Sequence, residues 1–292
     1  MDATRPPTSI ADLRHALDAV GLQRGDKIIV HTALSAFGRV DGGPDAVVDL
    51  LLEQVGPEGT VVFPTFTGDT IISAILGGAG GASGAVILPN VDNVDLSDMR
   101  HPRIEHIDTG AVPRAARRRT DFAKSNHPLY SIAGKGPLMP RLIAASEKYI
   151  FASQADKDLY LLAMAGGKAL LLGCDLISNS SIHLISEFAG LDYKVQDRPY
   201  WKMTVDEFLA LPRTRQAELL RIHCGMCLSY DIKKRYDRIE EPLRQANALR
   251  MTQVNSACIR LIDTQAMLRV GLEAVRRNPW LMADKIEKPA HG

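Results

Sequence analysis

The stretch of sequence that decides the fold is "DKIIVHTALSAFGRVDGGPDAVVDLLLEQVGPEGTVVFPTF", residues 26–66. It contains two short apolar runs, and between them a glycine-bearing loop and apolar residues at helical spacing. Pro44 suits the first position of a helix, and Gly56 suits the position after its end. Short apolar runs flanked by turn residues are typical of strands that are covered on both faces. The stretch therefore predicts a strand, a helix and a second strand.

The same alternation continues outside this unit. Residues 9–22 predict a helix that Ser9 caps and Gly21 closes, and "KALLLGC" at 168–174 predicts another buried strand. Together these segments predict an α/β fold in which a layered mixed β-sheet is flanked by helices. We expect a single domain over residues 1–292, built from two interlocked halves. The glycine-dense segment "ILGGAGGASGA" at 75–85 predicts a mobile loop.

Composition and charge exclude several classes of protein. The formal net charge of +1 gives no basic footprint for nucleic acid. No uninterrupted apolar run approaches the roughly 20 residues that a membrane span needs. Four cysteines in 292 residues do not make a disulfide framework, and the first residues lack an apolar signal region. We therefore expect a cytoplasmic protein with neither a nucleic acid nor a membrane as partner.

Two features of the first unit allow a functional and a structural interpretation. Gly42 and Gly43 precede a helix start, whose N–H groups and partial positive charge suit a phosphate. The spacing matches no standard phosphate-binding motif, so a plain turn is the preferred interpretation of the glycine pair. His31 ends the first strand, at the sheet edge where α/β folds place functional side chains. The alternative for His31 is a local hydrogen bond that supports the loop.

The segment "GCDLISNSSIHLISEFAG", residues 173–190, contains the strongest candidate for catalysis. Residues 179–181 are N-cap types, so a helix begins there and His183 falls in its first turn. His183 and Glu187 share a helix face, where the carboxylate can orient the imidazole as in a catalytic triad. Backbone donors at the helix start can stabilise an oxyanion. An ordinary helical His–Glu pair remains the alternative.

Two further motifs favour structural interpretations. In "SNHPLYS", residues 125–131, the side chains of Ser125, His127 and Ser131 are expected to fix a loop by bonds to the backbone. In "HCGMC", residues 223–227, the two thiols have zinc spacing, but no second Cys-x-x-Cys pair completes the four ligands. Packing residues in a helical region are the preferred interpretation of those cysteines.

Over nearly its whole length the chain resembles the aminoglycoside 3-N-acetyltransferase family, also called the antibiotic N-acetyltransferases. Residues 21–66 are similar to the family's opening, with "HTAL" at 31–34 in place of a His-Ser-Ser-Leu motif. "SNHPLYSIAGKG" at 125–136 resembles a Ser-x-His-Pro-x-x-Ser segment. Residues 168–190 resemble a Leu-Leu-Gly strand followed by Asn-Thr-x-x-His and a glutamate. "TQVNSACIRLIDTQAMLRVGLEAV" at 252–275 is similar to the family's close.

The resemblance implies an antibiotic N-acetyltransferase-like fold, distinct from the GNAT fold, and acetyl transfer from acetyl-CoA to an amine without a metal. His183 would be the general base and Glu187 its orienting partner. The N-terminal half would bind acetyl-CoA and the C-terminal half would hold the catalytic residues. The residues implied in cofactor binding are His31, Thr32, Ala33, Leu34, Gly42, Gly43, Ser125 and Ser180. The implied partner is a small-molecule amine, and the protein could form a homodimer.

The chain departs from the family pattern at three places. The family's glutamate comes three residues after the histidine, where this chain has Ser186, and Glu187 is one residue further on. Thr32 and Ala33 replace a pair of serines, so one hydroxyl contact to the cofactor would be missing. The run "PRAARRR" at 113–119 takes the place of an expected glutamate. That run is either a solvated helix face or a site that attracts a phosphate or carboxylate.

These departures bear on the substrate. A polycationic aminoglycoside favours an acidic cleft, yet acidic and basic residues balance here. Asp69 in "FPTFTGD" is the one obvious carboxylate for a substrate amine, and a turn residue after Gly68 is its alternative role. An amine on a sugar or another small metabolite is therefore as plausible an acceptor as an aminoglycoside. A degenerate family member that binds CoA or a partner without turnover, and a zinc hydrolase at residues 223–227, are the other hypotheses.

Overall fold

The computed structural model describes residues 7–68, 71, 75, 104, 107–151, 158–191, 202–227 and 232–285, with the backbone alone at 221–227, 232 and 285. The strands are β1 Lys27–Thr32, β2 Thr60–Pro64, β3 Ala123–Lys124, β4 Ile132–Lys135, β5 Lys168–Leu172, β6 Ile232–Lys234, β7 Leu249–Val254, β8 Ala257–Asp263 and β9 Ala283–Lys285. The α-helices are α1 Ile10–Ala19, α2 Gly43–Val55, α4 Ala111–Arg118, α5 Met139–Ser146, α6 Asp158–Met164, α7 His183–Phe188, α8 Val205–Ala210, α9 Arg213–Cys227, α10 Glu240–Gln245 and α11 Thr264–Arg277.

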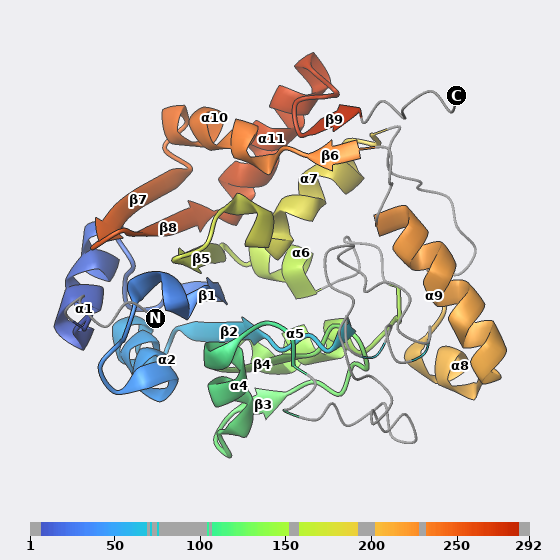
Figure 1. Ribbon diagram of the computed structural model, residues 1–292, viewed down its shortest axis with the longest axis horizontal. Helices are drawn as coiled ribbons and strands as arrows, with labels where there is room; N and C mark the ends of the chain where they lie inside the picture. The colour runs from blue at the N-terminus through green and yellow to red at the C-terminus, as the bar shows by residue number, and fades with distance from the viewer. Residues whose placement is uncertain are drawn as a thin grey trace, which may run out of the picture.

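A seven-stranded mixed sheet forms the centre of the molecule, with strand order β3-β4-β2-β1-β5-β8-β7 (Figure 1). The three central strands β2, β1 and β5 are parallel, and β4 and β8 continue the sheet on either side as antiparallel strands. Strands from early and late parts of the chain are thus neighbours in one sheet. The α/β fold with a mixed sheet that the sequence predicts is confirmed.

Strand alternation divides the core into two apolar layers. In β1, Ile28 and Val30 face the layer that contains α1, α2 and α4. Ile29 faces the opposite layer, which contains α5, α6, α7, α10 and α11. Because successive side chains of a strand point to opposite faces, the His31 side chain faces the same layer as Ile29. The Thr32 side chain faces the same layer as Val30. The end of β1 therefore sends one candidate residue to each side of the sheet.

The predicted ends of the first two helices are confirmed. The Ser9 hydroxyl accepts from the Asp12 backbone N–H at 3.1 Å, and the Asp12 carboxylate accepts from the Ser9 N–H at 3.2 Å. This capping box satisfies donors that the first turn of α1 would leave open. Helix α2 has proline in its first turn, and Gly56 follows it with a φ of 67°. A left-handed φ of this kind favours glycine over residues with a Cβ atom.

A third apolar cluster lies away from the central sheet. It joins α8 and α9 to the loop before β4 through residues that include Leu129, Phe151 and Phe208. Figure 1 shows α8 and α9 at the opposite end of the molecule from α1. Among the described residues, no helix is both long enough and apolar enough to cross a membrane.

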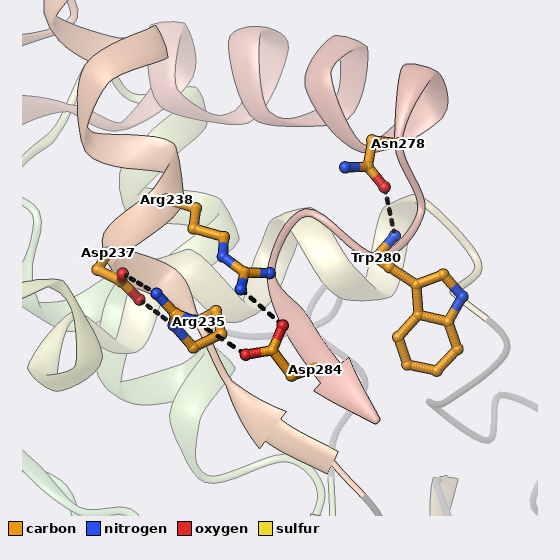
Figure 2. Close-up of polar contacts among 6 residues, drawn as sticks. All are labelled: Arg235, Asp237, Arg238, Asn278, Trp280 and Asp284. Carbon is orange, nitrogen blue, oxygen red and sulfur yellow. Dashed lines mark hydrogen bonds and ion pairs between the residues drawn. The ribbon is translucent and has the colours of Figure 1, made fainter. Parts of the chain in front are cut away.

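The small sheet β6–β9 ties the last described strand to the segment before α10. Its strands are antiparallel, and the Arg235 N–H donates to the Met282 carbonyl at 2.8 Å. The turn between α11 and β9 is closed by the Asn278 side chain, which accepts from the Trp280 N–H at 3.1 Å (Figure 2). This sheet borders the short 3-10 helix η8, Tyr236–Ile239, which becomes important below.

A glycine allows α11 to approach α7 closely. A Cβ atom on Gly271 would lie 2.3 Å from Cδ1 of Ile185, two residues after His183. Ile185 is fully buried and has no room to withdraw. Alanine in place of glycine normally stabilises a helix interior by about 1 kcal/mol. We expect the opposite for Gly271→Ala, because overpacking costs roughly 1–3 kcal/mol.

The prediction is tested by urea unfolding of Gly271→Ala, Ile185→Val and the double variant. Ile185→Val removes Cδ1, the nearest atom, but keeps Cγ1, which lies 2.6 Å from the added Cβ. The double variant should therefore recover part of the loss and be more stable than the sum of the two single changes predicts. Simple additivity of the three free-energy changes would show that Gly271 does not set the distance between α7 and α11.

Candidate functional site

The candidate site lies where the parallel strands β1, β2 and β5 end. Carboxyl ends of parallel strands meet at one sheet edge, which is where open α/β sheets bind ligands. His31 and Thr32 end β1, and the segment after β5 contains His183. The N-cap residue of α4 also reaches this edge, because a Cβ on Gly110 would lie 3.8 Å from the Thr32 carbonyl. Segments far apart in the sequence thus converge on one edge.

His31 links the first strand to the catalytic segment. Its Nε2 atom accepts a hydrogen bond from the Ser180 backbone N–H at 3.4 Å. Because Nε2 is the acceptor, the proton of the neutral ring resides on Nδ1. The side chain is 8% exposed, and burial lowers its pKa to about 4. His31 is therefore neutral near pH 7. Its bond is not the local one that the structural alternative expects, because it holds Ser180, 149 residues away along the chain, in the loop that leads to His183.

The rest of the "HTAL" segment turns away from the strand at once. The Ala33 N–H donates to the Leu172 carbonyl of β5 at 2.8 Å, and Leu34 begins a 3-10 helix, η1, that ends at Phe37. The Thr32 hydroxyl oxygen is buried and has no hydrogen-bond partner. A buried hydroxyl without a partner is unfavourable, so this atom is a candidate for a contact that a bound molecule completes.

Gly42 and Gly43 form the entry to α2 with φ angles of 70° and 65°. A Cβ on Gly42 would lie 2.6 Å from the Ala46 Cβ, whereas a Cβ on Gly43 would meet nothing within 4 Å. Helix α2 has no side-chain cap. The backbone at Gly43 is thus open to close approach, but its N–H donates to the Val40 carbonyl at 3.1 Å and Pro44 has no N–H. An anion at this helix start would depend on the N–H groups that follow Pro44.

The segment that leads to His183 differs from the prediction. A 3-10 helix, η6, spans Ser180–Ile182 and precedes α7. Asn179 caps it, because its side chain accepts from the Ser181 N–H, and the His183 N–H donates to the Ser180 and Ser181 carbonyls. The Ile182 N–H donates to the Asn179 carbonyl, and the Ser180 N–H donates to His31. The backbone N–H groups of residues 180–183 therefore all have acceptors within the chain, and an oxyanion site at the start of α7 stays a prediction.

His183 is the first residue of α7 and is half-buried. Its Nδ1 atom lies 3.2 Å from the Tyr236 hydroxyl oxygen, within hydrogen-bond distance. The two rings also meet edge to face, with centroids 5.6 Å apart and planes at 82°. Sequence reasoning missed Tyr236, which is 53 residues away along the chain. No local spacing signals this contact.

The two candidates for the orienting carboxylate position differ in environment. Ser186 is 1% exposed, and its hydroxyl has no hydrogen-bond partner. Glu187 is half-buried on the same short helix. A carboxylate at position 186 would be buried with its charge, which is costly without a partner. The role of Glu187 as orienting group stays a prediction.

Ser125 is fully buried some distance from His183. Its hydroxyl accepts from the Ile132 N–H at 2.9 Å. Ser125 follows β3, and four strand spacings, about 19 Å, separate β3 from β5 in the sheet. Nearby, the His127 Nδ1 accepts from the Leu129 and Tyr130 N–H groups, and its Nε2 lies 3.1 Å from the Tyr149 carbonyl. The predicted loop-fixing role of Ser125 and His127 is confirmed, and a cofactor contact by Ser125 remains a prediction.

The arginines of residues 113–119 are mostly tied into the fold. Arg114 donates to the Ile107 carbonyl, and the buried Arg117 donates to the Ser125 carbonyl at 2.8 Å. Arg119 pairs with Asp49 at 2.7 Å and stacks on a phenylalanine ring. The solvated helix face expected for this run is therefore wrong for these three residues. They form structural links between α4 and its neighbours.

Several predicted features fall outside the description. Asp69 and most of the segment 75–85 are not among the described residues, and only the helical backbone is given for "HCGMC". Among the described residues, no group of three or more histidine, cysteine or acidic side chains is placed to hold a metal ion. Cys174 and Cys258 are free thiols. Burial raises the pKa of Cys174 to about 11 and also raises the pKa of Cys258.

Comparison with known sequences gives a family match over most of the chain. Residues 29–276 match the model of the aminoglycoside 3-N-acetyltransferase family. The chain is 26% identical over 275 residues to aminoglycoside N(3)-acetyltransferase VIII of Streptomyces fradiae, covering 91% of both chains. It is 30% identical over 190 residues to aminoglycoside N(3)-acetyltransferase VII of Streptomyces paromomycinus, covering 61% of this chain. That second match spans 59% of the relative's length.

Solved structures show the same fold. The apoenzyme of aminoglycoside acetyltransferase AAC(3)-IVa superposes with a TM-score of 0.63 at 18% identity, covering 96% of this chain and 93% of that chain. A binary complex of AAC-IIIb with CoASH superposes with a TM-score of 0.59 at 20% identity, covering 93% and 97%. The antibiotic N-acetyltransferase-like architecture is therefore confirmed.

Proposed function

Because this chain belongs to the aminoglycoside 3-N-acetyltransferase family, we propose that it transfers the acetyl group of acetyl-CoA to a primary amine of an aminoglycoside or a related amino sugar. The observation that supports the proposal most strongly is the contact between His31 and Ser180. It joins the "HTAL" segment, implied in cofactor binding, to the segment that contains His183. Both implied parts of an acetyltransferase site therefore meet at one sheet edge.

The chemistry requires a base at the amine. An alkyl ammonium has no lone pair, so it must lose a proton before its nitrogen attacks the thioester carbonyl. We assign the removal of this proton to His183, because imidazole titrates near physiological pH. The N–C bond forms as the C–S bond breaks, and His183 can give the proton it has taken to the departing thiolate. The nitrogen loses a second proton to solvent, so the products are the amide, CoASH and one released proton. Glu187 is proposed to stabilise the protonated ring.

The residues at the sheet edge fit the polar parts of acetyl-CoA. The partnerless Thr32 hydroxyl offers a hydrogen bond, and the open backbone at Gly43 lets an anion approach the N–H groups of α2 that follow Pro44. A pyrophosphate is an anion that such a helix start stabilises. The proposal is supported by the CoASH-bound AAC-IIIb structure, which shares the fold. Ala33, Leu34 and Ser180 complete the proposed cofactor contacts along the same edge.

Direct transfer is favoured over an acyl-enzyme on Cys174 or Cys258. A thiol attacks as its thiolate, and burial raises the pKa of both groups above the ordinary value. These thiols are therefore poorly ionised at neutral pH. The amine itself is the better nucleophile once His183 has deprotonated it.

The proposed acceptor follows from the relatives, which are named aminoglycoside N(3)-acetyltransferases. The balanced charge of this chain makes other amino sugars and small amines necessary members of a substrate panel. A thiol-release assay with acetyl-CoA and such a panel tests the function. CoA release that depends on one of the amines supports the proposal. Binding of acetyl-CoA without release by any amine favours the alternative, a family member that has lost turnover.

Gly43→Ala should weaken acetyl-CoA binding by about tenfold, equivalent to ~1.4 kcal/mol. A methyl group at this open backbone position would obstruct the approach of a phosphate. Calorimetric titration with acetyl-CoA measures the effect. Gly25→Ala is the matched control, because Gly25 has a φ of 82° and equally open surroundings but lies at the other end of β1. Equal loss of affinity in both variants would refute a phosphate site at Gly43.

A further inference from the structure

We propose that Tyr236 is a positioning residue that selects the reactive tautomer of His183. Its hydroxyl oxygen accepts a hydrogen bond from Nδ1–H of His183, which leaves Nε2 as the basic nitrogen. The catalytic consequence rests on the proposed function of His183 as general base. The direction of the hydrogen bond is inferred from the need for a basic Nε2, and the tautomer can be measured without any activity.

The geometry restrains both rings. The 3.2 Å contact joins the Tyr236 oxygen to Nδ1, and the edge-to-face contact holds the ring planes nearly perpendicular. Tyr236 is 4% exposed, so its ring has little freedom to leave this position. Edge-to-face packing and a hydrogen bond together fix both the location and the rotation of the imidazole. A half-buried histidine at a helix end would otherwise sample several rotamers.

The direction of the hydrogen bond decides the chemistry. A neutral imidazole has one protonated and one basic nitrogen, and the partner of one nitrogen determines the state of the other. If the phenol donated to Nδ1, the proton would reside on Nε2 and that nitrogen could not accept one from an amine. A phenol oxygen that accepts from Nδ1–H leaves Nε2 basic. It also keeps its bond when the ring becomes an imidazolium, because Nδ1–H is present in both states.

The element that carries Tyr236 is held by charged neighbours on both sides of it. Arg235 makes two hydrogen bonds to the Asp237 carboxylate, at 3.0 and 2.9 Å, and a third to Asp284 at 2.9 Å. Arg238 pairs with the other oxygen of Asp284 at 2.6 Å. Figure 2 shows these side chains linking the start of η8 to β9. The hydrogen bonds from the two arginines lower the pKa of Asp284, so the link persists at neutral pH.

This arrangement explains why a tyrosine distant in the sequence can set the state of His183. Strand β9 is anchored by its pairing with β6 and by the Arg235 N–H bond to Met282. The ion pairs then fix Arg235, Asp237 and Arg238, the residues that surround Tyr236. Exposed ion pairs contribute little individually, but a shared network restricts the backbone between its members. The phenol is thereby presented to His183 at a defined position.

The test is Tyr236→Phe, which keeps the ring and removes the hydroxyl. Imidazole ¹⁵N chemical shifts identify which nitrogen of His183 is protonated, and the spectrum of His183→Ala assigns the signal. We expect the Nδ1–H tautomer in the wild type and a loss of that preference in Tyr236→Phe. We further expect kcat to fall by about tenfold with KM nearly unchanged, less than the 10²–10⁴-fold loss of removing a general base, because the base itself remains. Tyr160→Phe, which removes the hydroxyl of a partly buried tyrosine in α6, should keep the wild-type tautomer and kcat.

Two results would overturn the proposal. An Nε2–H tautomer of His183 in the wild type would show that Tyr236 donates rather than accepts. A Tyr236→Phe enzyme with the wild-type tautomer and wild-type kcat would show that the hydroxyl has no positioning role. Failure of the proposed function would look different, because no amine would then release CoA even from the wild-type protein while the tautomer signal remained measurable.

Discussion

Replacing His183 by alanine is expected to reduce turnover by roughly 10²–10⁴-fold, the contribution typical of a general base. The variant should bind acetyl-CoA with wild-type affinity, because the proposed cofactor contacts lie on "HTAL" and at the start of α2. The physical reason is that the acceptor amine stays protonated without a base beside it. Steady-state thiol release and calorimetric binding of acetyl-CoA measure the two quantities separately.

A matched control for this substitution is His15→Ala. His15 is an exposed histidine of α1, which packs in the apolar layer opposite to the one that contains α7. The His15→Ala variant should turn over substrate at the wild-type rate. Wild-type turnover in His183→Ala would remove His183 from the mechanism. Loss of acetyl-CoA binding in that variant would assign His183 a structural role instead.

His31 should make the fold sensitive to acid. Its folded pKa is about 4, lowered by burial, whereas an unfolded histidine titrates near 6.5. Between these values the unfolded chain binds more protons, so the free energy of unfolding falls as pH falls through this window. The difference of about 2.5 pKa units corresponds to about 3 kcal/mol, fully present above pH 6.5 and lost by pH 4.

The effect of His31 is isolated by comparison with His31→Gln, whose amide oxygen can still accept from the Ser180 N–H but does not titrate. Urea unfolding at several pH values between 4 and 7 gives both stability profiles. The wild type should lose about 3 kcal/mol more than His31→Gln over this range. Parallel profiles would mean that His31 is exposed to solvent or protonated in the folded protein.

The elements were predictable from sequence wherever local signals agree. Pro44 and Gly56 mark the ends of α2, and Ser9 with Asp12 marks the start of α1. The short apolar runs of β1, β2 and β5 are covered on both faces, as continuous apolar strands usually are. These features depend only on neighbours within a few residues.

The candidate site was less predictable, because its geometry depends on contacts between distant segments. The 3-10 helix η6 uses the N–H groups that a regular α-helix would leave open at its start, so the expected oxyanion donors are engaged within the chain. Tyr236 reaches His183 only through the packing of η8 against the segment after β5. The arginines after Pro113 predict a charged surface, yet Arg114 and Arg117 donate to backbone carbonyls. Every residue has a backbone carbonyl, so the sequence does not show which carbonyls will accept a hydrogen bond from a side chain.

The central claim is direct acetyl transfer from acetyl-CoA to an amine, and rapid-quench analysis of a single turnover tests it most directly. The enzyme would be mixed with acetyl-CoA labelled in its acetyl group and with the best amine from the panel. The account predicts that label appears on the amine as it leaves acetyl-CoA, with none attached to the protein at any time. Label on the protein before the product, or no labelled amine with any member of the panel, would contradict it.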